Sequence, residues 1–161
     1  MKVALTCDHL LEREPVHTLL EMACSMFPEA TIFTLAHQKG RVLGPIEQHP
    51  IRSSYLGNKV QSTQQLESHL MLVPSAAKKL QIPCSFDLVI HFSTGLSHGI
   101  GTCKKTTELT YLYENHLEQK SSTFLGKIFN SYVSAWSNRL LLDSTHLLQS
   151  IDHSKLKAEV L

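Results

Sequence analysis

Short apolar runs alternate along the chain with longer segments in which apolar residues recur at helical spacing. The short runs predict strands at 2–6, 31–35, 51–56, 86–90, 109–113 and 139–143. The longer segments predict helices at 15–27, over one or two stretches of 60–80, and at 124–136 and 145–156. Strands that alternate with helices are typical of a doubly wound α/β domain, with a mostly parallel sheet of about five to seven strands and helices on both faces.

One strand ends where small and polar residues begin. The apolar run 86–90 is followed by Ser93, Thr94 and Gly95, and the predicted first strand leads into a loop that carries Asp8 and His9. Ligands of open parallel sheets bind beyond the carboxyl ends of the strands, so these side chains are expected to meet at one edge. The candidate ligand-binding residues are therefore Asp8, His9, Ser93, Thr94, Gly95 and His98.

Each of these residues also has a structural interpretation. Aspartate in such a loop often caps a neighbouring helix or turn, which is the alternative role for Asp8. The segment 93–95 could form a simple turn. His98 is one of ten histidines in the chain, and an isolated histidine is more often a packed or surface residue than a catalytic one.

Composition narrows the class of protein. A chain of 161 residues with 42% hydrophobic content has enough apolar residues for one core, and we expect one domain. Lysine plus arginine (15) nearly balances aspartate plus glutamate (14), which argues against non-specific nucleic-acid binding. The four scattered cysteines form no metal-ligand pattern, so we expect reduced thiols and no metal or cofactor. No apolar run suits a signal peptide or a membrane span, which favours a cytoplasmic location.

Several segments together carry a resemblance to a known family. They are Lys2-Val3-Ala4-Leu5 leading to Asp8, the stretch 20–35 with Phe27-Pro28-Glu29-Ala30, the pair Arg52 and Ser54, the run 86–90 with Ser93 and Gly99, and Leu140-Leu141-Leu142-Asp143-Ser144. In this order and spacing they resemble the amino-terminal half of the retaining glycosyltransferases of family 4, which have the GT-B fold. The resemblance implies a Rossmann-like, acceptor-side domain spanning 1–161, without the donor-binding domain that completes the cleft in that family.

The chain departs from the family pattern at two places. Where the family has a glycine pair after the first strand, this sequence has Glu12-Arg13-Glu14-Pro15, whose side chains would crowd a phosphate-binding loop. Where the family has histidine followed by threonine and proline, this sequence has Tyr113-Glu114-Asn115, with His116 one residue further on. Tyr113 and His116 therefore join the candidate ligand-binding residues, and no catalytic residue is assigned.

Three functions remain open. The chain could be a non-catalytic module that binds a sugar, a nucleotide or a signalling ligand and works with a partner. It could instead be the acceptor-binding subunit of a split, active glycosyltransferase whose donor site lies on another chain. In the third hypothesis it is an interaction scaffold that holds a second copy of itself or another protein. Because a missing second domain would leave apolar surface exposed, self-association as a homodimer is expected. The aromatic stripe that ends at Trp136 allows peripheral membrane contact, but core packing against the sheet is the favoured explanation.

Overall fold

The computed structural model describes residues 1–112, apart from the side chains of His98 and Leu112. The strands are β1 (Val3–Leu10), β2 (Thr31–His37), β3 (Ile51–Ser53), β4 (Leu88–Ser93) and β5 (Thr107–Leu112). The α-helices are α1 (Val16–Met26), α2 (Thr63–Ser68) and α3 (Val73–Lys79). The short 3-10 turns within residues 1–112 are η1 (Pro45–Gln48), η2 (Tyr55–Asn58), η3 (Leu70–Leu72) and η4 (Ser97–Gly99). The elements predicted at 124–136, 139–143 and 145–156 lie outside the described residues.

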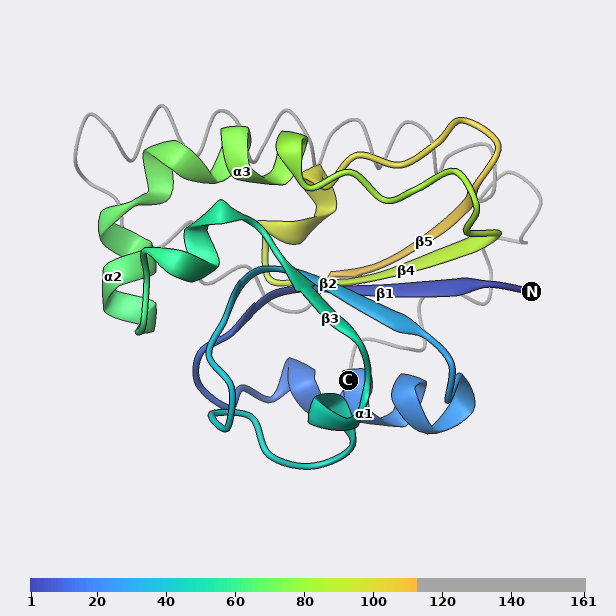
Figure 1. The fold of residues 1–161 in the computed structure, drawn as a ribbon, viewed down its shortest axis with the longest axis horizontal. Coiled ribbons are helices and arrows are strands. Elements are labelled where there is room, and N and C mark those ends of the chain that lie inside the picture. The colour runs from blue at the N-terminus through green and yellow to red at the C-terminus, as the bar shows by residue number, and fades with distance from the viewer. Residues whose placement is uncertain (113–161) are drawn as a thin grey trace, which may run out of the picture.

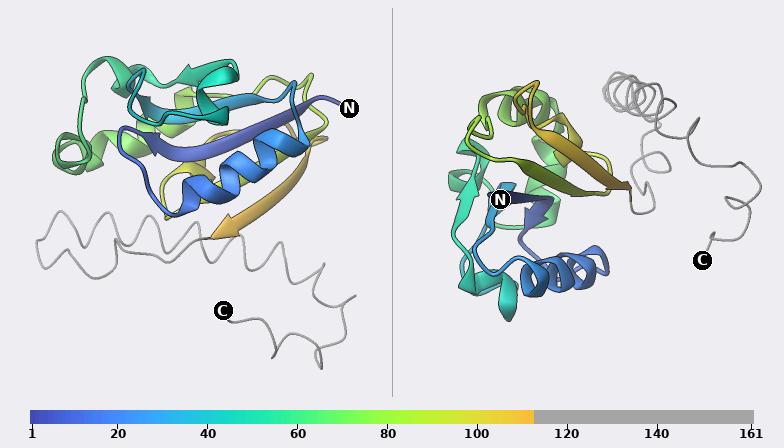
Figure 2. Two further views of the ribbon diagram at one scale, coloured as in Figure 1. Left: turned by 90° about the horizontal axis from the view of Figure 1, so that it is seen from below. Right: turned by 90° about the vertical axis from the view of Figure 1, so that its right-hand side faces the viewer.

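The five strands form one open, wholly parallel sheet. Their order is β3-β2-β1-β4-β5, so β1 lies between β2 and β4 and pairs with both. Helix α1 covers one face of the sheet, while α2 and α3 lie on the other (Figures 1 and 2). This arrangement confirms the predicted fold class: the chain has a Rossmann-like α/β fold.

Each face of the sheet has its own hydrophobic core, because successive strand residues point to opposite sides. On the α1 side the core residues include Val3, Leu5, Cys7, Leu20, Cys24, Ile32, Ile90 and Phe92. On the α3 side they include Ala4, Phe33, Leu35, Leu56, Leu66, Val73, Ala76 and Val89. Burial on both faces explains why these strands are apolar runs rather than alternating ones.

Several predicted strand boundaries were wrong. β4 covers Leu88–Ser93 rather than 86–90, and β5 begins at Thr107 rather than at residue 109. The first strand does not end at residue 6 but continues to Leu10, because its backbone stays paired with β2 as far as His37. Thus Asp8 and His9 lie within the carboxyl-terminal part of β1, not in a loop. The third strand stops at Ser53, since the Ser54 hydroxyl accepts a hydrogen bond from the Leu56 N–H and starts the turn η2.

The expectation of four reduced cysteines was also wrong. Cys84 and Cys103 form a disulfide, with their Cα atoms 5.3 Å apart. It links the segment before β4 to the segment before β5, whose backbones are also joined by a hydrogen bond from Ile82 N–H to Gly101 carbonyl. Cys7 and Cys24 remain buried thiols, and burial raises the pKa of Cys24 to about 11.

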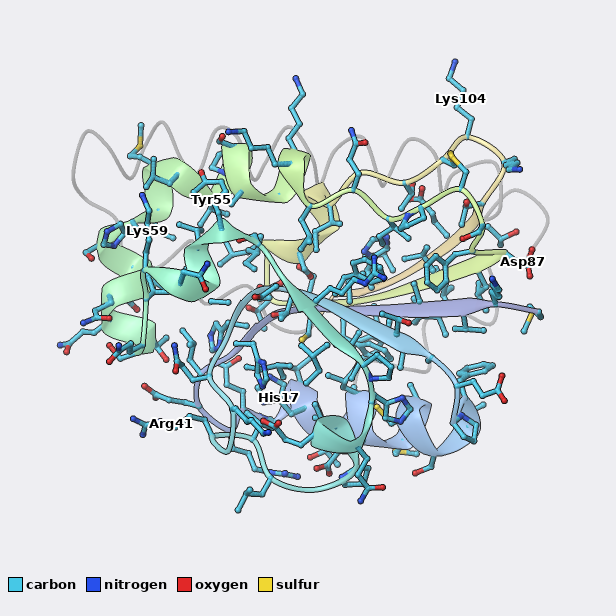
Figure 3. The ribbon with its side chains drawn as sticks, viewed as in Figure 1. His17, Arg41, Tyr55, Lys59, Asp87 and Lys104 are labelled. Carbon is cyan, nitrogen blue, oxygen red and sulfur yellow. A yellow bond between two sulfur atoms is a disulfide. The ribbon has the colours of Figure 1, made fainter. Side chains whose placement is uncertain are left out.

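Tyr55, in the turn η2, contacts the turn η3 on the α3 side of the molecule. Its hydroxyl donates a hydrogen bond to the Leu72 carbonyl at 3.2 Å. The ammonium groups of Lys59 and Lys79 lie 5.9 and 5.4 Å from its ring centroid. Figure 3 shows Tyr55 and Lys59 on this side, with His17 on the α1 side.

None of the helices within residues 1–112 is long and apolar enough to cross a membrane.

Candidate functional site

The predicted site lies where the strand order reverses. From β1 the chain proceeds to β2 and β3 on one side, whereas β4 and β5 lie on the other side of β1. The carboxyl ends of β1 and β4 are therefore neighbours, and at such a point the flanking loops separate and leave room for a ligand. Asp8 and Ser93, which are 85 positions apart, meet here as expected.

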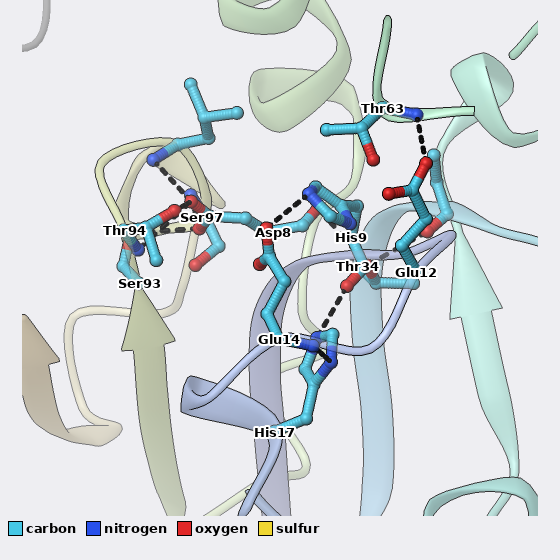
Figure 4. Close-up of polar contacts among 12 residues, drawn as sticks. Asp8, His9, Glu12, Glu14, His17, Thr34, Thr63, Ser93, Thr94 and Ser97 are labelled. Carbon is cyan, nitrogen blue, oxygen red and sulfur yellow. Dashed lines mark hydrogen bonds and ion pairs between the residues drawn. The ribbon is translucent and has the colours of Figure 1, made fainter. Parts of the chain in front are cut away.

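The Asp8 carboxylate lies at the centre of a ring of hydrogen-bond donors. Its two oxygens accept from the hydroxyl of Ser93 (3.0 Å), from the N–H and hydroxyl of Thr94 (3.0 and 2.6 Å), and from the N–H groups of Leu96 (3.1 Å) and Ser97 (2.7 Å). Figure 4 shows the side chain extending from β1 into the loop after β4. Because Asp8 is only 3% exposed, this ring replaces the water it loses.

Gly95 allows the loop to wrap around the carboxylate. Its φ of +131° is one that side chains rarely adopt, and its N–H donates to the Ser93 hydroxyl at 3.0 Å. Backbone N–H groups brought together in this way form a concave anion-binding surface. In this protein the anion is the Asp8 carboxylate itself. Its contacts are those of a residue that caps a turn, which is the structural alternative given for Asp8 in the sequence analysis.

His9 points away from Asp8, as neighbouring strand residues do, and enters a second polar group (Figure 4). Its Nε2 lies 3.4 Å from the Glu14 carboxylate. The ring is 5% exposed, and its Nδ1 is buried without a hydrogen-bond partner in the described part of the chain. A buried polar atom with no partner costs free energy, which makes this nitrogen a candidate for ligand contact.

His9 and Glu14 each stabilise the charged form of the other. Burial disfavours the charged imidazole, but the hydrogen bond and negative charge of Glu14 outweigh it, so the pKa of His9 is raised above 6.5. Burial likewise penalises the Glu14 carboxylate, and the contact with His9 reverses the effect, so the pKa of Glu14 is lowered. Both shifts favour the ion pair, with the proton on the His9 imidazole and the negative charge on Glu14.

His17 fixes the loop that carries Glu14. Its Nδ1 accepts a hydrogen bond from the Glu14 N–H at 3.0 Å, which leaves the ring proton on Nε2 to donate to the His9 carbonyl at 2.9 Å. Burial lowers the pKa of His17, consistent with a neutral ring. His17 thus holds the loop between β1 and α1 and thereby positions Glu14 beside His9.

The rim of the site carries hydrogen-bond acceptors. Glu12 is exposed, and its carboxylate accepts a long hydrogen bond of 3.5 Å from the Thr63 N–H. The Glu14 side chain is 31% exposed. The Thr63 hydroxyl is a second buried atom without a partner among residues 1–112, and Figure 4 shows it directed toward His9 and Glu12. We call His9, Glu12, Glu14 and Thr63 the carboxyl-edge site.

The other predicted residues divide into two groups. His98 falls within the turn η4 (Ser97–Gly99), directly after the ring of donors around Asp8. Tyr113 and His116 lie outside the described residues. From the sequence, Glu14 was considered only as a departure from a glycine pattern, although the loop after the first strand of a parallel sheet lies at its carboxyl edge. Thr63, at the start of α2, was not predicted.

The described residues hold no group of three metal-ligating side chains. An open hollow of about 500 Å³ lies at the opposite, amino-terminal edge of the sheet and is lined in part by Lys2, Arg52 and Phe86. It contains none of the candidate residues. The polar network therefore lies at the edge where parallel sheets bind ligands, and the hollow does not.

Comparisons with family models, with curated proteins and with solved structures found no match for this chain. The resemblance to family 4 glycosyltransferases stays a prediction from the sequence. The geometry of the carboxyl edge is what bears on function.

Proposed function

We propose that this chain is a ligand-binding module for a neutral, hydroxyl-rich ligand such as a sugar acceptor, and that it needs a partner chain for any glycosyl transfer. The observation that carries the proposal is the saturation of Asp8, whose carboxylate accepts hydrogen bonds from the donors at the carboxyl end of β4. Those donors are then not available to a phosphate. The carboxylates and the imidazole of the carboxyl-edge site remain.

The chemistry of the remaining groups favours hydroxyl ligands. Sugar hydroxyls donate hydrogen bonds well, and carboxylates such as Glu12 and Glu14 accept them. The same two carboxylates repel a nucleotide phosphate. Among the ligands considered from the sequence, a neutral sugar therefore fits this edge better than a nucleotide.

The need for a partner follows from the charges at the site. Retaining sugar transfer needs positive or N–H groups that stabilise the departing diphosphate. The cation in the loop between β1 and α1 is Arg13, and it is engaged by Glu21 through two hydrogen bonds of 2.7 Å. The nearest donors at the neighbouring strand end are held by Asp8. A donor-binding chain would have to supply these groups.

A thermal-shift titration tests the proposal. The chain is heated with maltose and cellobiose as neutral probes and with UMP and UDP-glucose as phosphate-bearing probes. A specific ligand at a hundred times its dissociation constant adds about 2.7 kcal/mol of stability. We expect stabilisation by at least one neutral sugar, loss of that effect in Glu12→Gln, and no stabilisation by UMP.

Each other outcome contradicts a defined part of the proposal. Stabilisation by UMP would assign a nucleotide site instead. Absence of stabilisation by every probe would favour the scaffold hypothesis. Sugar transfer from UDP-glucose to maltose or cellobiose by the isolated chain would overturn the requirement for a partner.

A further inference from the structure

The two buried atoms without partners both belong to residues of the carboxyl-edge site. His9 Nδ1 and Thr63 Oγ1 are the buried side-chain atoms of residues 1–112 that lack a hydrogen bond. They come from β1 and from the start of α2, more than 50 positions apart, and Figure 4 shows the Thr63 hydroxyl on the same side as the His9 ring. Since natural proteins rarely leave such atoms unpaired, two of them in one site indicate a missing partner.

The hydrogen-bonding character of His9 Nδ1 is set by Glu14. In the neutral ring, the proton stays on Nε2, where the Glu14 carboxylate lies 3.4 Å away. Nδ1 then carries a free lone pair and acts as an acceptor. The Thr63 hydroxyl can both donate and accept, so a single ligand hydroxyl can donate to Nδ1 while it accepts from Thr63.

Access requires movement of the chain around these atoms. Both atoms are shielded from solvent, and Thr63 is the first residue of α2. This helix has six residues, of which only Leu66 is buried, and Thr63 N–H reaches Glu12 at 3.5 Å, the limit of a hydrogen bond. An element with so few buried contacts opens at low cost.

We infer that His9 Nδ1 and Thr63 Oγ1 form the anchoring subsite of this module and together bind one hydroxyl group of the ligand after α2 moves aside. This inference rests on the proposed function and names the atoms that recognise the ligand. Glu14 is a positioning residue, because it holds the ring in the tautomer that accepts.

The test uses the chain of 161 residues with His9→Gln, Thr63→Val and the control His49→Asn. Glutamine places its amide near the position of Nε2, so the contact with Glu14 remains while Nδ1 is lost. Valine keeps the shape of Thr63 without its hydroxyl. His49 binds the Ala30 carbonyl through Nδ1 at 2.9 Å, beside the amino end of β2, and asparagine preserves that contact.

Affinity for maltose or cellobiose is measured by calorimetry at a pH above the raised His9 pKa found by NMR titration, where the ring is neutral. We expect about tenfold weaker binding for His9→Gln, a few-fold weaker binding for Thr63→Val, and wild-type affinity for His49→Asn. Long-range nitrogen NMR of the wild-type imidazoles should show the His9 proton on Nε2, with a change at Nδ1 when sugar is added.

The failures are distinguishable. If the wild type binds neither sugar, the proposed function fails and the inference fails with it. If the wild type binds but folded His9→Gln binds equally well, the inference alone is overturned. A His9 proton found on Nδ1 also overturns it, whatever the affinities, and the same holds if the only partner of Nδ1 in the sugar complex is a water molecule.

Discussion

Asp8 shows how one side chain organises a loop. The carboxylate is buried between β1 and the segment after β4. It accepts hydrogen bonds from two hydroxyls and three backbone N–H groups, which would otherwise donate to water. Removing it leaves these donors without an acceptor, a loss larger than that of a single hydrogen bond. The loop would then lose the conformation that brings it to the strand-order reversal.

Asp8→Ala should therefore destabilise the fold by about 3 to 5 kcal/mol in urea denaturation. Asp8→Asn should lower the unfolding free energy less than Asp8→Ala does, because the amide oxygen still accepts hydrogen bonds. It should still destabilise the fold, because the amide NH₂ group faces other donors. The matched control is Asp87→Ala, whose exposed carboxylate accepts one hydrogen bond from the Lys2 N–H and should matter by about 1 kcal/mol or less. Equal losses for Asp8→Ala and Asp87→Ala would contradict the role of Asp8.

Glu14→Gln should lower the pKa of His9, since the negative charge that favours the imidazolium is removed. A raised histidine pKa stabilises the fold below about pH 6.5 and ceases to do so as pH rises through the raised value. The lowered pKa of Glu14 stabilises above about pH 4.5 and ceases to do so as pH falls through the lowered value. The pair thus contributes most between these limits.

The measurement is the stability difference between wild type and Glu14→Gln at about pH 5.5 and about pH 8, with His9 followed by NMR. The difference should be larger at the lower pH. His17, whose lowered pKa acts in the opposite direction, is present in both proteins. Glu47→Gln, at the separate His37–Glu47 pair of 3.0 Å, is the control and should leave the His9 titration unchanged. A pH-independent difference would mean that His9 and Glu14 are not coupled.

Among the elements, the connections into β4 and β5 are held by a covalent link. The Cys84–Cys103 disulfide closes a segment of 19 positions that contains β4 and the ring of donors around Asp8. A cross-link of that span restricts the unfolded chain and stabilises the folded one. It therefore supports the strand end at which Asp8 is bound.

Reduction, or the substitution Cys84→Ala, should lower the unfolding free energy by about 3 kcal/mol. Dithiothreitol should have no further effect on Cys84→Ala, which controls for the two buried thiols Cys7 and Cys24. Titration of the denatured, unreduced chain should find two thiols. Four thiols would show that the disulfide does not form.

For the molecule as a whole, the sheet order sets where stability concentrates. β1 pairs on both sides and lies between two cores, whereas β3 has three residues, none of them buried, and pairs with β2 alone among the described strands. Amides that open only with global unfolding exchange most slowly. Hydrogen exchange should thus be slowest in β1 and faster by orders of magnitude in β3 and α2. Equal protection of β1 and α2 would contradict the easy opening of α2 on which the anchoring subsite depends.

Local sequence patterns predicted most of the strands and helices found within residues 1–112. The apolar runs, the proline at the start of α1 and the serine that caps α2 are signals that act over a few positions, and they predicted the elements and the parallel sheet. The end of β1 escaped prediction because pairing with β2 outweighs the polarity of Asp8 and His9. The disulfide escaped because cysteine spacing without a motif carries no information on proximity.

The amino-acid order was sufficient for the fold class and for the edge of the sheet at which Asp8, His9 and Ser93 gather, since hydrophobic periodicity and strand ends are local properties. The role of each side chain was not local. Asp8 is committed to Thr94, Leu96 and Ser97, and His9 is placed with Glu14 and Thr63, only because β1, β4 and α2 come together in space. Hydrogen bonds depend on distances of a few ångströms between residues far apart in the chain, and packing alone sets those distances.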